Sequence, residues 1–440
     1  MKIAVISGRY YPNLFGGGEI YAYDLNNEME RMGHEVSVFT SSFKGTPHSE
    51  TINNVKVQRT KIVPFTFKNI GIRGINSIVN SVNPQICSDI TDFIRQNRPE
   101  IVHFNDSWDI LGFMPALKVK KQGIPYIVDL HVPWLVCFNG ICFRNGKTCL
   151  ESIAPIRCTN CTVNAFSDLF GRWQKIAKPA LWVEIGVFLL VQKISKHFLG
   201  EAEKVVVHSR FMKEVIQKKL CVAEKKLEVV PCFVSNSFMK QSEEMSSLRI
   251  DEKKKRSDII LSVGRLVPGK GFTRLLKVFS GVIKENRDSK LIIVGEGPQR
   301  EQLENLAKKL GINNNVTFTG RVSNQRLLDY YTMSKVFVFP ATRAEPFGMV
   351  NIEAMAYSLP VVASKSGGVT DIVVDNLTGF LVDIDNNGML TEKILQLLSD
   401  DALAEKMGAQ GRKRVEEKFT LNIVAKRVLE IYKNTLDRKA

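Results

Sequence analysis

The chain has 440 residues, of which 44% are hydrophobic and 24% are charged. This length exceeds what one compact core usually holds, and the composition is typical of a water-soluble globular protein, so we expect two or three domains. The net charge of +16 favours an anionic partner such as a nucleotide, an anionic lipid surface or nucleic acid. Charge alone does not choose among these partners.

The residues Met1–Ile6 run directly into a strand-like pattern, without the charged and apolar regions of a secretory signal peptide. The longest apolar run, Ala180–Val191, is interrupted by Glu184 and is too short to cross a hydrocarbon core of roughly 30 Å. We therefore expect a cytoplasmic protein, at most peripheral on the inner face of the membrane.

Short β-rich runs alternate with amphipathic helical patterns along the whole chain. In the first half, the predicted strands are Ile3–Ser7, Glu35–Phe39, Ile101–Phe104, Tyr126–Leu130, Lys204–His208 and Leu227–Val230. In the second half, they are Ile259–Val263, Lys290–Val294, Val316–Thr319, Val336–Phe339 and Pro360–Ala363. This alternation predicts the α/β class, with two Rossmann-like doubly wound parallel-sheet domains facing a cleft.

A polar stretch rich in Lys, Glu and Ser separates the two halves. We assign residues 1–237 to the first domain, 238–257 to a linker and 258–420 to the second domain. A last helical pattern occupies 421–440, and the sequence leaves open whether it packs on the first domain or on the second.

A glycine-rich loop follows the first predicted strand and contains Gly16, Gly17, Gly18 and Glu19. Glycines before a helix permit positive φ and the close approach of a phosphate. The spacing is not that of the dinucleotide fingerprint. The alternative is a plain strand-to-helix turn.

A basic loop follows the strand Ile259–Val263 and carries Arg265 and Lys270. Both side chains can reach one diphosphate, because a guanidinium offers a bidentate fork and an ammonium group acts as a point charge. The alternative is a solvated basic loop.

Two glutamates eight residues apart, Glu345 and Glu353, flank the start of another predicted helix. The amides of Phe347, Gly348 and Met349 at that helix start suit an anion. Phosphate-binding amides between two hydroxyl-binding carboxylates fit a sugar nucleotide. The alternative is a pair of solvated surface acids.

His131 lies just past an apolar strand, where an imidazole can orient a hydroxyl, although a lone histidine is also commonly structural. His103 occupies a parallel strand end and is a weaker candidate for the acceptor side.

Five of the eight cysteines fall between residues 137 and 161. Cys158 and Cys161 form a C-x2-C pair, and with Cys137 and Cys149 they suit a tetrahedral structural zinc, which leaves Cys142 spare. Such a zinc would have no open position for catalysis. Free thiols or a redox pair are the alternatives, because the spacing matches no standard finger.

The segment Asp168–Phe198 mixes aromatic and aliphatic residues with arginine and lysines. This mixture is typical of a helix at an anionic membrane surface. The alternative is one long core helix.

The chain resembles the retaining, two-Rossmann-domain (GT-B) glycosyltransferases of family four. The resemblance lies in the glycine-rich loop, the basic loop with Arg265 and Lys270, and the Glu345/Glu353 pair, together with Gly295-Glu296-Gly297 and Gly367-Gly368. The resemblance covers nearly the whole chain and is strongest from Asp258 to Leu381. Glu345 and Glu353 match the E-x7-E motif of that family.

The resemblance implies an acceptor-side first domain and a second domain that binds a nucleotide sugar. Glu345, with the amides of Phe347–Met349, would bind the donor sugar, and Glu353 the ribose. Arg265 and Lys270 would bind the diphosphate, and Gly17 and Gly18 would allow the first domain to close onto it. Val350 would lie near the phosphates, and Arg321 and Val322 near the base. His131 would occupy a catalytic position on the acceptor side.

The resemblance further implies a retaining transfer of sugar from a nucleoside-diphosphate sugar to a hydroxyl of a glycan or lipid-linked acceptor. No metal or other cofactor is expected for catalysis. Arg265 and Lys270 would take the place of a metal. One rival is a sugar-nucleotide epimerase of the same fold. The other, a basic zinc-containing nucleic-acid binder, is disfavoured because the sequence has no recognised docking motif.

Overall fold

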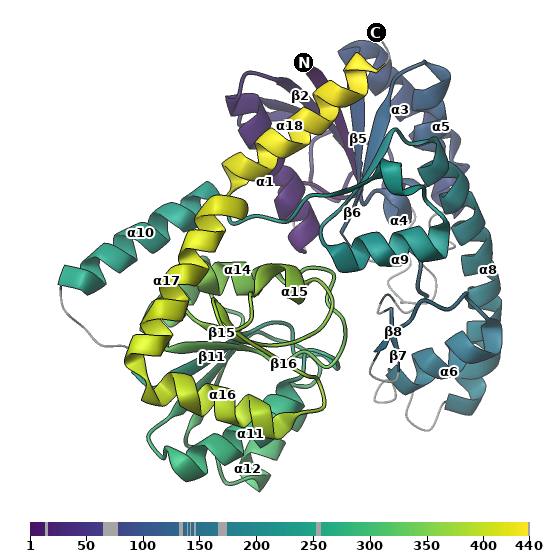
Figure 1. The fold of residues 1–440 in the computed structure, drawn as a ribbon. Helices are drawn as coiled ribbons and strands as arrows, with labels where there is room; N and C mark the ends of the chain where they lie inside the picture. Colours follow the sequence, from purple (N-terminus) through teal and green to yellow (C-terminus); the bar gives the residue numbers. More distant parts are fainter. Residues whose placement is uncertain are drawn as a thin grey trace. The chain divides into compact units, whose positions relative to one another are not determined.

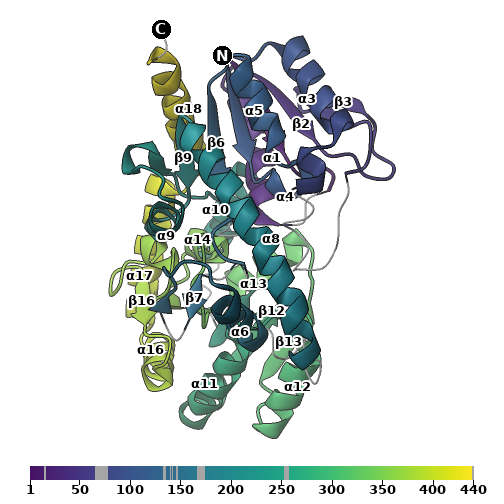
Figure 2. The same ribbon diagram turned by 90° about the vertical axis from the view of Figure 1, so that its right-hand side faces the viewer.

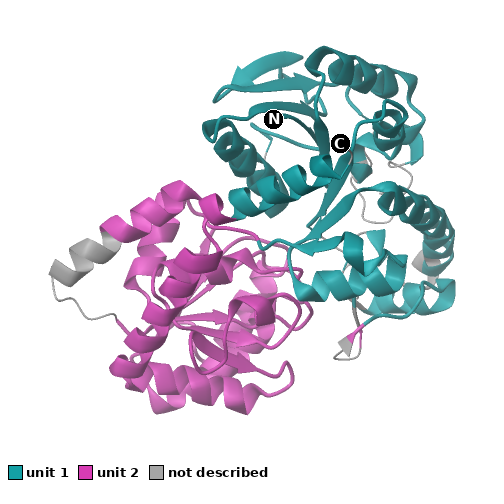
Figure 3. Cartoon of the chain, turned by 45° about the horizontal axis from the view of Figure 1, so that its top comes forward, with its two compact units in different colours: residues 1–142, 149–231, 424–440 teal, residues 143–148, 232–423 magenta. Residues whose placement is uncertain are grey.

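The computed structural model describes the chain except residues 14–15, 65–77, 132–134, 139, 141, 145–146, 166–173, 252–256 and 439–440. The chain divides into two compact units (Figure 3). Unit 1 comprises Met1–Cys142, Cys149–Pro231 and Val424–Ala440, and unit 2 comprises Phe143–Thr148 and Cys232–Ile423. The chain therefore leaves unit 1, builds unit 2 and returns to unit 1 with its last helix.

Unit 1 contains an eight-stranded sheet in the order β10-β9-β6-β5-β1-β2-β4-β3. All neighbouring strands are parallel except β3 and β4, which are antiparallel. The strands are β1 (Lys2–Ser7), β2 (Glu35–Thr40), β3 (Ser49–Ile52), β4 (Val55–Arg59), β5 (Ile101–Asn105), β6 (Tyr126–Leu130), β9 (Lys204–Val207) and β10 (Leu227–Val229).

The helices of unit 1 are α1 (Gly17–Arg31), α3 (Pro84–Asn97), α4 (Trp108–Leu111), α5 (Met114–Lys121), α6 (Pro155–Ala165), α8 (Gln174–Glu201), α9 (Arg210–Leu220) and most of α18 (Leu421–Asp437) (Figure 1). Strands β5 and β6 are buried at every residue, as expected of parallel strands covered on both faces. The carboxyl ends of β5 and β6 therefore lie at the edge of a packed core.

Unit 2 contains a six-stranded, fully parallel sheet in the order β13-β12-β11-β14-β15-β16. The strands are β11 (Ile259–Val263), β12 (Lys290–Val294), β13 (Val316–Gly320), β14 (Val336–Phe339), β15 (Val361–Ser364) and β16 (Gly379–Val382). The helices are α10 (Asn236–Asp251), α11 (Phe272–Glu285), α12 (Arg300–Lys309), α13 (Asn324–Met333), α14 (Met349–Ala356), α15 (Val369–Ile372), α16 (Asn387–Ser399) and α17 (Asp401–Lys418).

Each sheet reverses its winding direction once. In unit 2 the chain builds β11, β12 and β13 toward one edge and then β14, β15 and β16 toward the other. In unit 1 the same reversal lies between β1 and β5. Such a switch point leaves a crevice at the carboxyl ends of two neighbouring strands, where open α/β sheets bind ligands.

The predicted strands all appear in these two sheets, and the α/β class of two doubly wound parallel sheets is confirmed. The structure places the division between the units at Pro231/Cys232, a few residues before the expected boundary at 237. Much of the expected linker 238–257 is the helix α10. Residues 421–440 form α18, and from Val424 onward that helix belongs to unit 1.

A short antiparallel hairpin, β7 (Phe143–Arg144) with β8 (Lys147–Thr148), lies within the cysteine-rich segment 137–161, which we expect to be an insert in the first domain. Among the described helices, none combines the length and the apolar character needed to cross a bilayer.

Candidate active site

The switch point of unit 2 brings the basic loop and the acidic loop together. Lys270 follows β11 and Glu345 follows β14, and these two strands are neighbours. The Lys270 ammonium lies 2.9 Å from Glu345 Oε2 and 5.6 Å from the centre of the Phe339 ring. Both charged side chains are largely shielded from solvent, with 23% and 14% of their surfaces exposed. The ion pair is therefore better protected than a surface pair.

Glycines allow these loops to pack closely. A Cβ on Gly271 would overlap the carbonyl group of Pro340, and one on Gly269 would overlap the Arg343 guanidinium. Both glycines also have positive φ, at 81° and 89°. The amide of Thr342 donates to the carbonyl of Gly269 at 3.0 Å, which ties the two loops together. Only glycine meets both requirements at these positions.

A second pair of glycines supports Glu345 from the loop after β15. A Cβ on Gly367 would overlap the Glu345 backbone, and one on Gly368 would overlap the Pro346 carbonyl. The Gly368 amide donates to the Glu345 carbonyl at 2.7 Å. The position of Glu345 therefore depends on a neighbouring loop as well as on its own.

Arg343 is a site residue to which the sequence analysis gave no role. Burial and the nearby Arg265 guanidinium lower the pKa of Arg343, while Glu345 opposes them. Arg265 itself is exposed on the loop after β11. Lys270 and Arg343 thus lie near the Glu345 carboxylate, and Arg265 lies near Arg343. The sequence signal for a role of Arg343 was its position two residues before Glu345, in a loop after a buried strand.

The start of α14 lies directly after Glu345. Gly348 caps this helix with φ of 103°, and Met349 is its first residue. The amides of a first helical turn have no partners within their own helix, and they carry the positive end of the helix dipole. Val350 lies on this same turn. The predicted anion-binding residues Phe347, Gly348, Met349 and Val350 are consecutive and surround a helix start.

Glu353 lies on α14, one turn beyond Met349. Its Oε2 accepts a hydrogen bond of 2.9 Å from the hydroxyl of Tyr331, a fully buried residue of α13. Burial raises the pKa of Glu353, and the Tyr331 bond acts in the opposite direction. Tyr331 is thus a positioning residue that the sequence did not reveal, because α13 and α14 are separate in sequence.

Val322 follows β13, the edge strand of the same sheet, and is partly buried beside the exposed Arg321. The predicted donor-binding residues of unit 2 therefore all lie on loops or helix starts at the carboxyl ends of its strands.

The switch point of unit 1 brings Gly18 and His131 together. A Cβ on Gly18 would lie 3.2 Å from the His131 ring, so this glycine allows close packing. The expected positive φ is not found, because Gly16 is extended with φ of −151° and Gly18 is outside the left-handed region. Gly17 begins α1. The glycines here provide space and do not form a left-handed turn.

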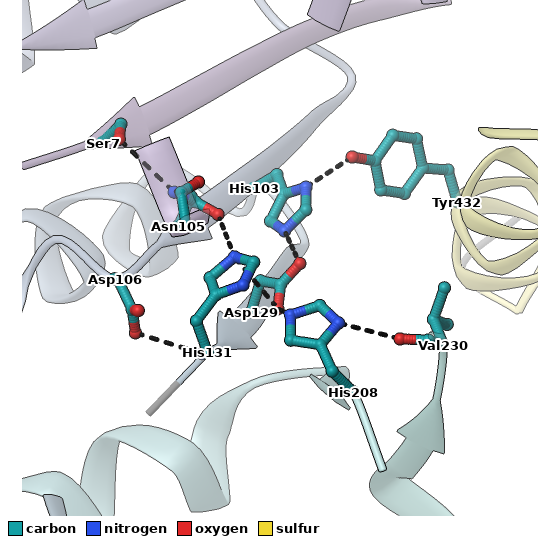
Figure 4. Close-up of polar contacts among 10 residues, drawn as sticks. Ser7, His103, Asn105, Asp106, Asp129, His131, His208, Val230 and Tyr432 are labelled. Atoms are coloured by element: carbon teal, nitrogen blue, oxygen red, sulfur yellow. Dashed lines mark hydrogen bonds and ion pairs between the residues drawn. The ribbon is translucent and has the colours of Figure 1, made fainter. Parts of the chain in front are cut away.

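A hydrogen bond fixes the orientation of the His131 ring. Its Nε2 lies 2.8 Å from Oδ1 of Asn105 (Figure 4). The amide nitrogen of Asn105 donates to the carbonyl of Gly18 at 3.5 Å. The Asn105 oxygen can only accept, so Nε2 of His131 carries the hydrogen. Burial and the neighbouring His208 lower the pKa of His131 to about 3, despite the opposing effect of Asp129. His131 is therefore a neutral ring with Nδ1 as an acceptor.

His208 carries the positive charge of this cluster. Its Nδ1 lies 2.8 Å from the carbonyl of Val230, and its Nε2 lies 2.8 Å from the fully buried carboxylate of Asp129 (Figure 4). A carbonyl accepts only, and a nitrogen lone pair facing a carboxylate at this distance is repelled, so both nitrogens carry hydrogens. His208 stacks on His131 with ring centres 4.1 Å apart. The charge of His208 opposes the effect of burial and holds the pKa of Asp129 well below its usual range.

His103 lies behind this cluster and does not face an acceptor. It is 3% exposed, its Nδ1 lies 2.6 Å from the hydroxyl of Tyr432 on α18, and its Nε2 lies 3.7 Å from Asp129 (Figure 4). The weaker acceptor-side candidate is therefore a structural histidine. The sequence did not show this, because Tyr432 is 329 residues away.

The cysteines gather differently from the predicted zinc set. The Cys142 amide donates to Sγ of Cys137 at 3.3 Å, and the Cys149 amide donates to the carbonyl of Cys142 at 2.8 Å. Cys158 and Cys161 lie on α6. No three of the described cysteine sulfurs lie within 4.8 Å of one another. The zinc site remains a prediction, and Cys142, previously left spare, lies between two of its expected ligands.

Comparisons with known proteins identify the family of this chain. A model of Glycosyltransferase Family 4 matches residues 15–238, and a model of glycosyl transferases group 1 matches residues 243–414. An uncharacterized glycosyltransferase of Methanocaldococcus jannaschii is 25% identical over 99% of both chains. A GDP-mannose-dependent phosphatidylinositol monomannoside mannosyltransferase of Mycolicibacterium smegmatis is 36% identical over 35% of this chain and 42% of its own length.

Among solved structures, an Anabaena protein in complex with UDP superimposes with a TM-score of 0.67 and 16% identity, covering 99% of this chain and 100% of that one. The same protein has also been solved with UDP-glucose. This likeness extends over both sheets and identifies the GT-B fold. The chain belongs to Glycosyltransferase Family 4.

Proposed function

We propose that this glycosyltransferase takes its sugar from a nucleoside-diphosphate sugar bound at the switch point of unit 2. The observation that carries the proposal is the shielded Lys270–Glu345 pair beside the start of α14. Cations and helix-start amides suit a diphosphate, and carboxylates suit sugar and ribose hydroxyls. A relative that depends on GDP-mannose and a structural neighbour solved with UDP-glucose support the same donor class.

The ion pair suggests how donor binding prepares the site. Without donor, the Lys270 ammonium and the Glu345 carboxylate satisfy each other. A diphosphate offers Lys270 a more highly charged partner, and Glu345 is then released to accept hydrogen bonds from the sugar. Arg265 and Arg343 add positive charge on the same side. Neither glutamate needs to act as an acid or a base in this scheme.

The transfer itself breaks the bond between the anomeric carbon and the diphosphate oxygen and forms a bond to the acceptor oxygen. The proton of the acceptor hydroxyl passes to the leaving diphosphate, and we propose that configuration is retained by attack on the same face. Charge that grows on the leaving oxygen meets fixed cations and amides, which lowers the barrier. His131, neutral and hydrogen-bonded to Asn105, would orient a hydroxyl through Nδ1.

For the acceptor, we propose a glycan or a lipid-linked glycan. The support is the activity of the Mycolicibacterium smegmatis relative, a phosphatidylinositol monomannoside mannosyltransferase. Its match covers less than half of that protein, so the acceptor class rests on likeness within one part of the chain.

A thermal-shift screen with UDP, GDP, ADP and their sugars tests the donor site. A ligand at 100 times its Kd stabilises by about 2.7 kcal/mol. Glu353→Ala should lose most of the shift given by the nucleotide alone, and Glu345→Ala only the additional shift given by the attached sugar. Glu405→Ala, on the exposed face of α17, is the matched control and should keep both shifts. Equal losses in the two site variants would contradict the division of roles.

Incubation of the purified protein with the stabilising donor alone separates transfer from epimerisation. Slow hydrolysis to a nucleoside diphosphate and free sugar supports a transferase without its acceptor. Accumulation of an epimeric nucleotide sugar would instead support the epimerase, which has the same fold and needs no acceptor.

A further inference from the structure

Helix α8 of unit 1 has apolar side chains on two opposite faces. Leu181, Ile185 and Phe188 are buried in a cluster with Phe138 and Val163. On the other face, Trp182, Val183 and Leu190 are 50%, 70% and 51% exposed. A helix at the surface of a globular protein normally presents polar residues there. Apolar residues gathered on an exposed face commonly mark an interaction surface.

The exposed residues form one stripe along the helix axis. Trp182, Gly186, Leu190, Lys193 and His197 are all exposed and follow one another at spacings of three or four residues, which places them on one helix face. We call this set, with Val183, the α8 stripe. Phe188, which lies within the predicted interface segment Asp168–Phe198, belongs to the core face instead. Residues 166–173 of the predicted interface segment lie outside the described part of the chain.

Positive charge flanks the apolar part of the stripe. Lys178 lies one turn before Trp182, and Lys193 and Lys196 follow Leu190, all exposed. Glu184 is the only acidic residue between Gln174 and Gly200. It is partly buried off the stripe, and burial raises its pKa, which disfavours its negative charge. The stripe therefore combines an apolar centre with lysines that form no ion pair with the described residues.

A basic pocket continues the same face toward the end of α8. It has a volume of about 370 Å³ and is lined by Met114, Leu117, Lys118, Lys120, Lys121, His197 and Glu201. These residues belong to α5 and α8, both of which are labelled in Figure 2. Glu201 pairs with Lys120, which leaves Lys118, Lys121 and His197 facing the pocket without that acid. His197 is two turns beyond Leu190, so the pocket starts where the apolar centre ends. Apolar walls with several basic groups suit a lipid phosphate and its adjoining chains.

We propose that the α8 stripe and this pocket dock unit 1 onto an anionic lipid bilayer. Trp182, Val183 and Leu190 enter the boundary between headgroups and acyl chains, with the axis of α8 parallel to the surface. Lys178, Lys193 and Lys196 contact anionic headgroups, and the pocket receives the phosphate of one lipid. A second copy of the chain is a poorer occupant, because it would bring these lysines against lysines. Nucleic acid offers no partner for the apolar centre.

Co-sedimentation of the full chain with vesicles tests the proposal. Vesicles of phosphatidylcholine with phosphatidylglycerol should retain the protein, and vesicles of phosphatidylcholine alone should retain much less. Raising the salt from about 0.1 M to about 1 M should release a large part of it. Absence of binding to the anionic vesicles would overturn the proposal.

Two pairs of variants separate the two parts of the surface. Lys193→Glu with Lys196→Glu should lower the partition coefficient at least tenfold, since each lysine near such a surface contributes about 1 kcal/mol. Trp182→Ser with Leu190→Ser should weaken binding without changing its salt dependence. The controls are Lys308→Glu with Lys309→Glu on the exposed part of α12, and Leu377→Ser, which is 46% exposed in unit 2. Both controls should bind like the wild type.

Circular dichroism and the melting temperature of each variant confirm folding before vesicle binding is compared. Equal retention of stripe variants and wild type, or equal losses in the controls, would refute the assignment of this face. A wild-type dimer in gel filtration that Trp182→Ser with Leu190→Ser dissociates would identify a second copy as the occupant instead. Vesicle binding requires no donor and no sugar transfer, so its failure and the failure of the proposed reaction are distinguishable.

Discussion

The neutral state of His131 makes a quantitative prediction about acid. The wild type and His131→Asn are compared as the pH is lowered from 7 to 5. Asparagine removes the titrating ring and retains a side-chain amide that can donate to Asn105. Asp129 and His208 are present in both proteins, so their shared contribution to the pH dependence of the unfolding free energy cancels in the comparison.

The magnitude follows from the two protonation states. The ordinary histidine pKa of 6.5 applies to the unfolded chain, and burial with the His208 charge lowers it to about 3 in the folded chain. Between these values the unfolded state binds a proton that the folded state does not, so stability falls as the pH falls. The slope is about 1.4 kcal/mol per pH unit, which removes about 2 kcal/mol between pH 7 and pH 5.

Two measurements check this result. In a titration of the folded protein by nuclear magnetic resonance, the His131 ring carbon signal should stay constant down to pH 5, and its nitrogen shifts should be those of an Nε2-protonated ring. The signal is assigned by its absence in His131→Asn. In urea unfolding followed by a signal specific to unit 1, the wild type should lose about 2 kcal/mol more than the variant over this pH range.

A His131 signal that titrates near its ordinary pKa would refute the reasoning, as would equal acid sensitivity of the two proteins. The first result would mean that neither burial nor the His208 charge lowers the pKa of His131. A ring that titrated in this way would also become a candidate general acid, which the neutral ring is not.

Two further predictions concern unit 2. Gly367→Ala should lower the melting temperature and remove the sugar-dependent thermal shift, because a side chain there is opposed both by φ of 59° and by overlap with the Glu345 backbone. The control is Gly311→Ala, where φ is 70° and no atom lies within 4 Å of the added Cβ. It should cost only the backbone strain of about 1–2 kcal/mol. Tyr331→Phe should weaken nucleotide binding, measured by calorimetry, about tenfold. The loss should be larger at low pH, because without the Tyr331 hydrogen bond the pKa of Glu353 rises further. The control Tyr357→Phe keeps the Tyr331–Glu353 bond and should bind the nucleotide normally.

The sequence predicted the elements that local pattern determines. Buried parallel strands such as Lys290–Val294 are short continuous apolar runs, and their ends in the structure coincide with the predicted ones. The site loops were found for the same reason, since Lys270 and Glu345 each follow such a strand. The prediction that they converge needed only the rule for switch points in parallel sheets.

What the sequence did not show depends on contacts between distant segments. The edge strand β3 and its neighbour β4 were not predicted, because Ser49–Ile52 is polar and its pairing is decided by its neighbour. The role of Tyr331 appears only when α13 packs near α14, and the charge on His208 appears only when Asp129 and Val230 are placed around it. No local pattern contains these distances.

The hydrogen bond between His103 and Tyr432 bears on the order in which the protein is synthesised. Residues 1–231 leave the ribosome first, yet the helix that completes unit 1 begins to contribute only at Val424. Until then the surface that receives Tyr432 is uncovered, while all of unit 2 is being made and can fold, as independent units do during translation. The unit that begins first therefore finishes last. A recombinant fragment that stops at Pro231 would lack its closing helix, and a nascent chain needs protection at that surface for nearly its whole synthesis.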